Sequence, residues 1–190
     1  EAVYLTAATH DVKIAARMMG RESSWVQRVI RNVEGRWGRT LFHRLPWLNK
    51  TDEHTWEIAD DHADTLIRYM ASIRGEIQSV ESMALSSLGG TLDPSAYKSL
   101  RMRDIERAIT LQGNTSTTAG KLCGVKRTHV LGSTAKIERW LGVKIFDDLV
   151  EARANFKMLT LAGQAIFPHL EAIVRHWGEI KSLITPQERG

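Results

Sequence analysis

The sequence predicts a mainly α-helical protein with small β-wings, in which one helical unit occurs twice and a long helix follows each copy. Three observations support this fold class. The chain resembles itself when it is shifted by 104 residues. Apolar residues recur at helical spacing through most of its 190 residues. Glycines stand where the expected helices end, as at Gly20 and Gly124.

The composition narrows the class of protein further. Hydrophobic residues make up 43% of the chain and charged residues 25%, which is ordinary for a globular protein. The single cysteine, Cys123, excludes an internal disulfide framework and favours a reducing compartment. Since no apolar run approaches the roughly 18 residues of a membrane span, we expect a cytoplasmic protein without contact to a membrane.

Positive charge is concentrated in two blocks, although the formal net charge is only +4. Residues 1–50 hold nine Lys or Arg against four Asp or Glu, and residues 101–144 hold nine against three. Residues 51–85 are acidic, with two against eight. Basic blocks in folded domains are typical of proteins that bind polyanions, although arginines on solvated helix faces are the ordinary alternative.

The first copy is expected to contain two helices joined by a tight turn. The first helix is predicted over residues 11–19 and the second over 23–35, where Val26, Ile30 and Val33 have helical spacing. A short strand-based wing is expected to follow.

The second copy follows the same pattern. Residues 117–123 precede a glycine, and a helix is predicted over 127–140 with Val130 and Ile137 on its inner face. The repeat needs no gap over about 30 residues and includes these pairs: Ala15 and Ala119, Gly20 and Gly124, Val26 and Val130, Glu34 and Glu138, Gly38 and Gly142, Phe42 and Phe146. Beyond it Thr51 best matches Thr160, which predicts about five extra residues in the second copy.

Helix, turn, helix and wing form an arrangement that reads DNA, with the second helix in the major groove. The sequence therefore predicts tandem winged helix-turn-helix domains. We expect these divisions: winged helix-turn-helix 1 at 1–50, a long linker or dimerisation helix at 51–88, a junction at 89–100, winged helix-turn-helix 2 at 101–159 and a C-terminal helix at 160–185.

These residues resemble a known family. The stretches 15–20, 26–34 and 38–44 are similar to the N-terminal winged helix-turn-helix domain of LysR-type transcriptional regulators, and so are 121–125, 137–146 and 159–163. The resemblance implies sequence-specific binding of duplex DNA and transcriptional regulation in a bacterial cytoplasm, associated with the nucleoid. Such regulators usually carry an effector-binding domain. Because a second copy stands in its place here, we do not expect small-molecule sensing. We also expect no cofactor.

Apolar residues in the two long segments are spaced alternately by three and four, which is typical of a coiled-coil seam. The resemblance implies that this helix pairs subunits, as a homodimer, and the predicted dimerisation residues are Leu66, Met70, Ile73, Ile77, Val80, Ile173, Trp177 and Ile180. The first seam begins at Trp56. The two seams could instead pair with each other within one chain. Pro168 is expected to bend or delimit the second helix.

The candidate DNA-binding residues are polar or basic and lie on the second helix of each copy, in its preceding turn or in the wing. Arginine and glutamine can bond base edges bidentately, while hydroxyl groups and lysine bond phosphates. The set is Ser23, Ser24, Gln27, Arg28, Arg31, Arg39, Arg44, Lys50, Lys126, Arg127, Thr128, His129 and Ser133. A solvated helix face is the alternative for the candidates on the second helix of the first copy, Ser23, Ser24, Gln27, Arg28 and Arg31.

No motif indicates an enzyme or a metal site. The chain has no Gly-rich phosphate loop and no nucleophile elbow. His54 and His62 are eight residues apart, which is a poor spacing for one ion. An alternative function remains: a protein-interaction module or anti-activator that captures another regulator through its helical seams. A further protein partner, either RNA polymerase or another regulator, is possible for both of these functions.

Overall fold

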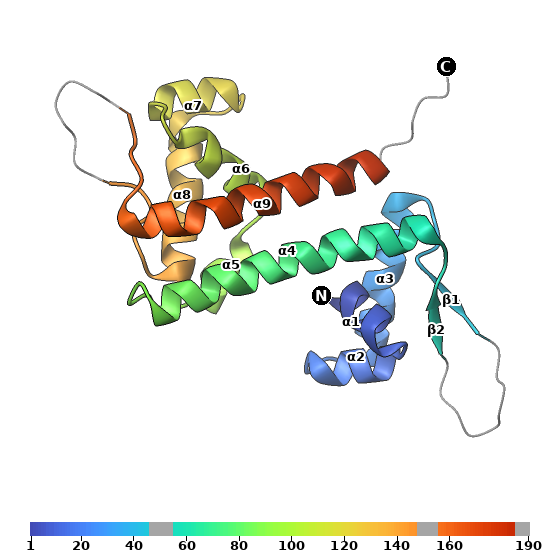
Figure 1. Ribbon diagram of the computed structural model, residues 1–190. Helices are drawn as coiled ribbons and strands as arrows, with labels where there is room; N and C mark the ends of the chain where they lie inside the picture. The colour runs from blue at the N-terminus through green and yellow to red at the C-terminus, as the bar shows by residue number, and fades with distance from the viewer. Residues whose placement is uncertain (46–54, 148–155, 185–190) are drawn as a thin grey trace, which may run out of the picture. The chain divides into compact units, whose positions relative to one another are not determined.

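The computed structural model of the protein describes residues 1–45, 55–147 and 156–184, which divide into two units (Figure 1). Unit 1 holds Glu1–Arg74 and the C-terminal residues from His176, and unit 2 holds Gly75–Arg175. The described residues are mainly helical, with one small antiparallel sheet. None of the described helices is long and apolar enough to cross a membrane.

Unit 1 begins with α1 (Ala2–Thr9), α2 (Val12–Met18) and α3 (Ser23–Trp37). The sequence predicted α2 and α3 within about two residues but missed α1. Local chemistry fixes the ends of α2 and α3. The Asp11 carboxylate accepts hydrogen bonds from the first main-chain N–H groups of α2, and Gly38 ends α3 with a φ of 71°.

A two-stranded hairpin follows α3. Strand β1 (Phe42–Arg44) pairs antiparallel with β2 (Trp56–Ile58), so that Phe42 lies opposite Ile58. The prediction that the helical seam starts at Trp56 is therefore wrong, because Trp56 lies in a strand. Helix α4 (Asp61–Ser86) begins later, where the Asp60 carboxylate accepts a hydrogen bond of 2.8 Å from the main-chain N–H of Ala63.

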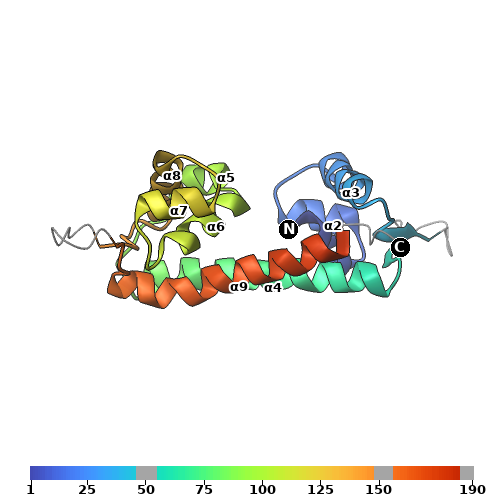
Figure 2. The same ribbon diagram turned by 90° about the horizontal axis from the view of Figure 1, so that it is seen from above.

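The described part of unit 2 contains four shorter helices, α5 (Pro94–Ser99), α6 (Met102–Leu111), α7 (Ser116–Leu122) and α8 (Arg127–Leu141). Figure 2 shows that they lie together on one side of the long helices within this unit. Helix α5 falls inside the predicted junction at 89–100. It forms there because Asp93 caps its N-terminus and Pro94 occupies its first position.

The long helix α9 (Leu161–Ile184) contains Pro168 and continues past it. The expectation that Pro168 delimits the helix is therefore wrong. Ile166, Leu170 and Ile173 are fully buried on either side of the proline. Tertiary packing of this face outweighs the main-chain hydrogen bond that proline cannot donate.

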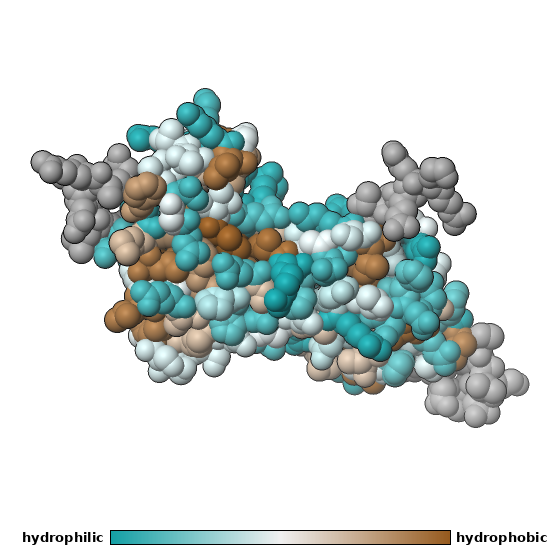
Figure 3. Space-filling model, turned by 45° about the horizontal axis from the view of Figure 1, so that its top comes forward, coloured by the Kyte–Doolittle hydropathy of each residue, from teal (hydrophilic) through white to brown (hydrophobic). Residues whose placement is uncertain are grey.

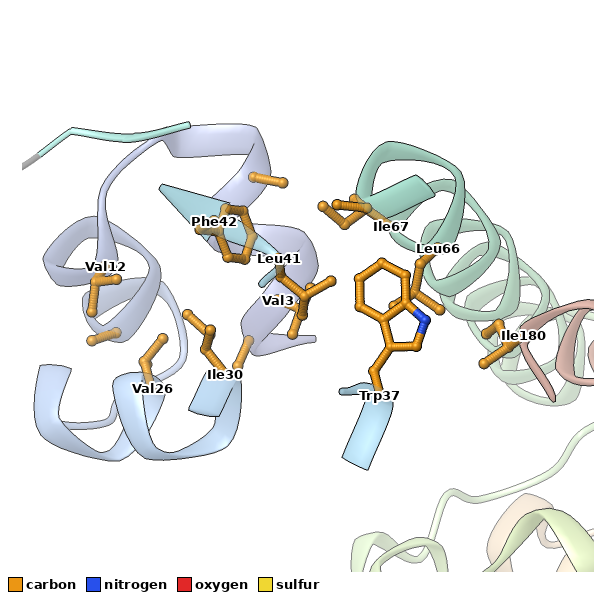
Figure 4. Packing of buried hydrophobic residues seen from close by; sticks show 14 residues of the cluster. Val3, Val12, Val26, Ile30, Trp37, Leu41, Phe42, Leu66, Ile67 and Ile180 are labelled. Carbon is orange, nitrogen blue, oxygen red and sulfur yellow. The ribbon is translucent and has the colours of Figure 1, made fainter. Parts of the chain in front are cut away.

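Both long helices contribute to the core of each unit. In unit 1 the cluster joins Val26 and Ile30 of α3 to Leu66 of α4 and Ile180 of α9 (Figure 4). The Trp37 indole also donates a hydrogen bond of 3.2 Å to the carbonyl of Leu183. In unit 2 the buried hydrophobic residues of the long helices are Val80 and Ala84 of α4 and Ile166, Phe167, Leu170 and Ile173 of α9.

The residues predicted for dimerisation are thus largely occupied within one chain. Leu66, Val80, Ile173 and Ile180 are at most 1% exposed, and Met70, Ile73, Ile77 and Trp177 are partly buried. This burial favours the alternative in which the seams pair within one chain. The homodimer stays a prediction.

The internal repeat is present in the structure. Helices α7 and α8 begin and end 104 residues after α2 and α3. Gly20 and Gly124 have positive φ angles of 59° and 63°, and each lets the chain turn sharply between its two helices.

The repeat changes register in the wing. Phe42 lies opposite Ile58, whereas Phe146 forms an antiparallel bridge with Leu159, so the shift there is 101 residues. The second wing is therefore shorter by three residues, and the prediction of about five extra residues is wrong. That prediction matched Thr51 with Thr160. In the structure Thr160 matches Asp60 instead, because the Thr160 hydroxyl caps the N-terminus of α9 and the Asp60 carboxylate caps the N-terminus of α4.

Candidate nucleic-acid interface

The outward face of α3 carries the main group of candidate residues. Val26 and Ile30 are fully buried in unit 1, while Gln27, Arg28 and Arg31 are exposed on the other side of the same helix. Helical periodicity separates the two sets, because residues three or four apart share a face. One face of α3 therefore anchors the helix, and the opposite face presents an amide and two guanidinium groups.

The turn before α3 holds the helix at a fixed angle to α2. The main-chain N–H of Arg21 donates to the carbonyl of Ala16 at 2.9 Å, and the buried small residues Ala15 and Ala16 let the two helices approach closely. Unit 2 repeats this bond between Val125 and Gly120 at 2.8 Å. The α2–α3 and α7–α8 pairs thus share one turn geometry.

The matched glutamates Glu34 and Glu138 have a structural task. The Glu34 carboxylate accepts main-chain hydrogen bonds from Leu41 at 2.8 Å and Phe42 at 3.4 Å. Glu138 accepts the same two bonds in unit 2, at 3.0 and 3.4 Å. These carboxylates hold the chain between the helix and the wing. Their negative charge is engaged there.

Most candidates in unit 1 are accessible. Ser24, Gln27, Arg28, Arg31, Arg39 and Arg44 are exposed, and Ser23 is half-buried. The Ser24 hydroxyl donates to Glu22 at 3.2 Å, and Arg39 lies 4.0 Å from the Asp60 carboxylate. Such exposed contacts stabilise little and exchange readily with other partners. Lys50 lies outside the described residues.

Four of the five candidates in unit 2 are exposed, namely Lys126, Arg127, Thr128 and His129. They form the end of the α7–α8 turn and the first turn of α8. Ser133 is different, because it is only 2% exposed and its hydroxyl donates to Asp104 at 2.7 Å. The assignment of Ser133 as a DNA contact is therefore corrected. Position 133 faces α6, toward the interior.

Asp104 is the centre of a polar network that joins α6 to α8. Its carboxylate accepts hydrogen bonds from Ser133, from the main-chain N–H of Arg101 at 3.0 Å and from Lys136 at 3.2 Å, and Arg107 lies 3.8 Å away. Burial alone would raise the pKa of Asp104, but these hydrogen bonds and the charge of Lys136 outweigh it and lower the pKa. The network fixes α8 without using its outward face.

Other basic residues adjoin the candidates and were not predicted. Arg17 and Lys121 occupy matched positions in the last turns of α2 and α7, and both are exposed. Arg21 is also exposed and lies 5.6 Å from the ring of Trp25. The shift of 104 residues that aligns the helices could have indicated the first pair, since it aligns two cations.

The face drawn in Figure 3 carries hydrophobic patches among hydrophilic residues. Met18 and Leu122, matched by the repeat, are 62% and 67% exposed. Among the described residues, no group of three or more His, Cys, Asp or Glu could hold a metal ion. His54 lies outside those residues, and Cys123 is half-buried at the end of α7.

Comparison with family models, curated proteins and solved structures gives no match for this chain. The candidate interface therefore rests on the chain's own geometry. That geometry occurs twice, with the same helix lengths, the same turn and the same glutamate contact.

Proposed function

We propose that the protein is a transcriptional regulator that binds double-stranded DNA sequence-specifically through two tandem winged helix-turn-helix domains. The observation that carries the proposal is the exposed face of α3, where Gln27, Arg28 and Arg31 project from a helix anchored on its other side. The short helix α2 precedes it and a hairpin follows it, which is the order of elements in a winged helix-turn-helix.

The dimensions and chemistry of α3 suit the major groove. A helix of 15 residues is about 22 Å long at 1.5 Å per residue. The groove is about 12 Å wide and admits one α-helix. Arginine bonds guanine bidentately and glutamine bonds adenine, so this face can distinguish base pairs.

The flanking cations supply the affinity that does not depend on sequence. Arg39 and Arg44 are exposed around β1, and Lys126 and Arg127 precede or begin α8. Each phosphate that such a side chain neutralises releases counterions, which favours binding. Added salt opposes this release, so each such contact lowers the logarithm of the binding constant by about 0.9 per tenfold rise in salt concentration. A repressor would use this affinity to block polymerase, whereas an activator would also contact it.

The test is selection of bound duplexes from random DNA, followed by salt titration of the preferred site against scrambled DNA. We expect a preference of about 1,000-fold or more for the selected site. Replacing Arg28 and Arg31 together by alanine should remove most of that preference. Arg36→Ala is the matched control, because it removes one exposed arginine of α3 outside the candidate set.

Absence of binding near physiological salt would contradict the proposal and favour the interaction module. That alternative relied on the helical seams as the capture surface. Because Leu66, Val80, Ile173 and Ile180 are buried within the chain, a partner would have to displace one long helix to reach them. For this reason we place DNA binding first.

A further inference from the structure

Helices α3 and α8 have the same length and occupy matched positions in the repeat, but their outward faces differ. The shift of 104 aligns Gln27 with Leu131, Arg28 with Gly132 and Arg31 with Ala135. All six of these positions are exposed. The same surface that carries an amide and two guanidinium groups in unit 1 therefore carries only hydrocarbon and bare backbone in unit 2.

Of the hydrogen-bonding side chains on α8 that are exposed, most lie at its beginning. Arg127, Thr128 and His129 lie in the first turn and are exposed. Lys136, which aligns with Asn32, binds the Asp104 carboxylate at 3.2 Å. Arg139 lies in the last turn, about three turns from the N-terminal end of the helix, which is the end that meets the bases in this motif.

Packing does not impose this difference. A Cβ atom added at Gly132 would meet nothing within 4 Å. Leu131 is 38% exposed and Ala135 is also exposed. Polar side chains would fit at all three positions, so the apolar surface of α8 is not a requirement of the fold.

We propose that the two units recognise DNA unequally, which rests on the proposed DNA-binding function. Unit 1 discriminates bases along two further turns of its helix, through Gln27, Arg28 and Arg31. Unit 2 reads only the bases next to the first turn of α8 and otherwise holds the phosphate backbone through Lys126 and Arg127. The preferred duplex is then asymmetric, with one strongly discriminating half-site and one permissive half-site.

The experiment measures the cost of each base change across the selected site, using the full chain. In the half-site of unit 1 we expect each mismatch to lower affinity by about 5- to 140-fold, the usual cost at a contacted base pair. In the half-site of unit 2 we expect each mismatch beyond the first few bases to lower affinity by less than about 5-fold. Cleavage from an iron chelate assigns the halves. The chelate is attached to Met18→Cys or to Leu122→Cys, two matched and exposed positions outside the candidate set, each in a Cys123→Ser background.

Two reciprocal variants test the cause. Leu131→Gln, Gly132→Arg and Ala135→Arg together should raise the mismatch costs in the permissive half-site toward those of the other half. Gln27→Leu, Arg28→Gly and Arg31→Ala together should lower the costs in the discriminating half-site to less than about 5-fold. The first variant gains a property, so a folding defect could not produce the expected result.

The outcomes separate this inference from the proposed function. A preferred site with equal mismatch costs in both halves would overturn the inference alone, as would cleavage that places α8 on the discriminating half. Absence of any preferred sequence would overturn the proposed function and the inference with it. Unequal halves that become similar in the first variant would support both.

Discussion

Glu34 and Glu138 each hold two main-chain N–H groups of the segment that leaves a helix. Without a carboxylate, those donors would lose partners that hold them in a partly buried position. An unsatisfied buried donor costs about 1–3 kcal/mol.

We therefore expect Glu34→Ala to lower the free energy of unfolding of unit 1 by about 1–3 kcal/mol. Glu34→Gln should cost less, because its amide oxygen still accepts from Leu41. Urea unfolding followed by hydrogen exchange in α3 measures both effects. Equal losses for the two variants would show that the side-chain oxygen has no such role.

Ser133 and Asp104 give a second expectation for single residues. Ser133→Ala should destabilise unit 2 by about 1–3 kcal/mol, because a buried charged acceptor loses a donor. It should leave the preference for the selected DNA unchanged, since the hydroxyl faces the interior. Melting curves and binding titrations of one preparation test this. A loss of preference for the selected DNA without a loss of stability would instead support Ser133 as a DNA contact.

The lowered pKa of Asp104 makes the stability of unit 2 depend on pH. The folded state holds this carboxylate ionised at a pH where the unfolded chain, with a pKa of about 3.9, already binds a proton. Its contribution is therefore complete above about pH 5 and is lost as pH falls below about 4 toward the folded pKa. Asp104→Asn should be less stable than the parent protein at pH 7. The difference in stability between the two proteins should be smaller at pH 3 than at pH 7. Thermal unfolding across this range is the measurement.

Among the helices, α8 is weakened by a glycine in its interior. Gly132 is exposed, and an added Cβ would meet no atom within 4 Å. We expect Gly132→Ala to stabilise α8 by about 1 kcal/mol, the usual difference between the two residues within a helix. The contrasting variant is Gly163→Ala, because a Cβ there would overlap the carbonyl oxygen of Ile145. The two melting temperatures should move in opposite directions.

The elements that the sequence predicted well are those with strong end signals. Helices α2, α3, α7 and α8 are each followed, within two residues, by a glycine in the left-handed region. Helix α1 has neither a capping side chain nor a segregated apolar face, since Ala2, Val3, Leu5, Thr6 and Ala7 are all buried. Periodicity therefore could not reveal it.

The wing itself was predicted, but its second strand, β2, was hidden by a coincidence of spacing. Trp56, Ala59 and Ala63 are three and four residues apart, as in a helical seam, yet Trp56 pairs with Arg44 across the hairpin. Each strand has only three residues, too few for an alternating pattern to be recognised. Ser133 was misplaced for a related reason, because a buried serine and an exposed one look alike until the partner, Asp104, is known.

In the molecule as a whole, each unit depends on residues distant in sequence. Ile180 is 1% exposed within the core of unit 1, and Val80 is fully buried in unit 2. We expect Ile180→Ala to cost about 2–5 kcal/mol and to speed hydrogen exchange more in α3 than in α8. Val80→Ala should have the reverse pattern. If each variant loosened both helices equally, the division into two units would not describe their stability.

The hydrogen bond from Trp37 to Leu183 spans 146 residues of sequence. During synthesis, the N-terminal helices leave the ribosome long before α9 does. The core of unit 1 therefore stays open, with Leu66 and Trp37 uncovered, until α9 has been made. Growth at about 5–20 residues per second makes this interval several seconds or more. A chaperone that shelters exposed apolar side chains would therefore have a larger effect on unit 1 than on unit 2.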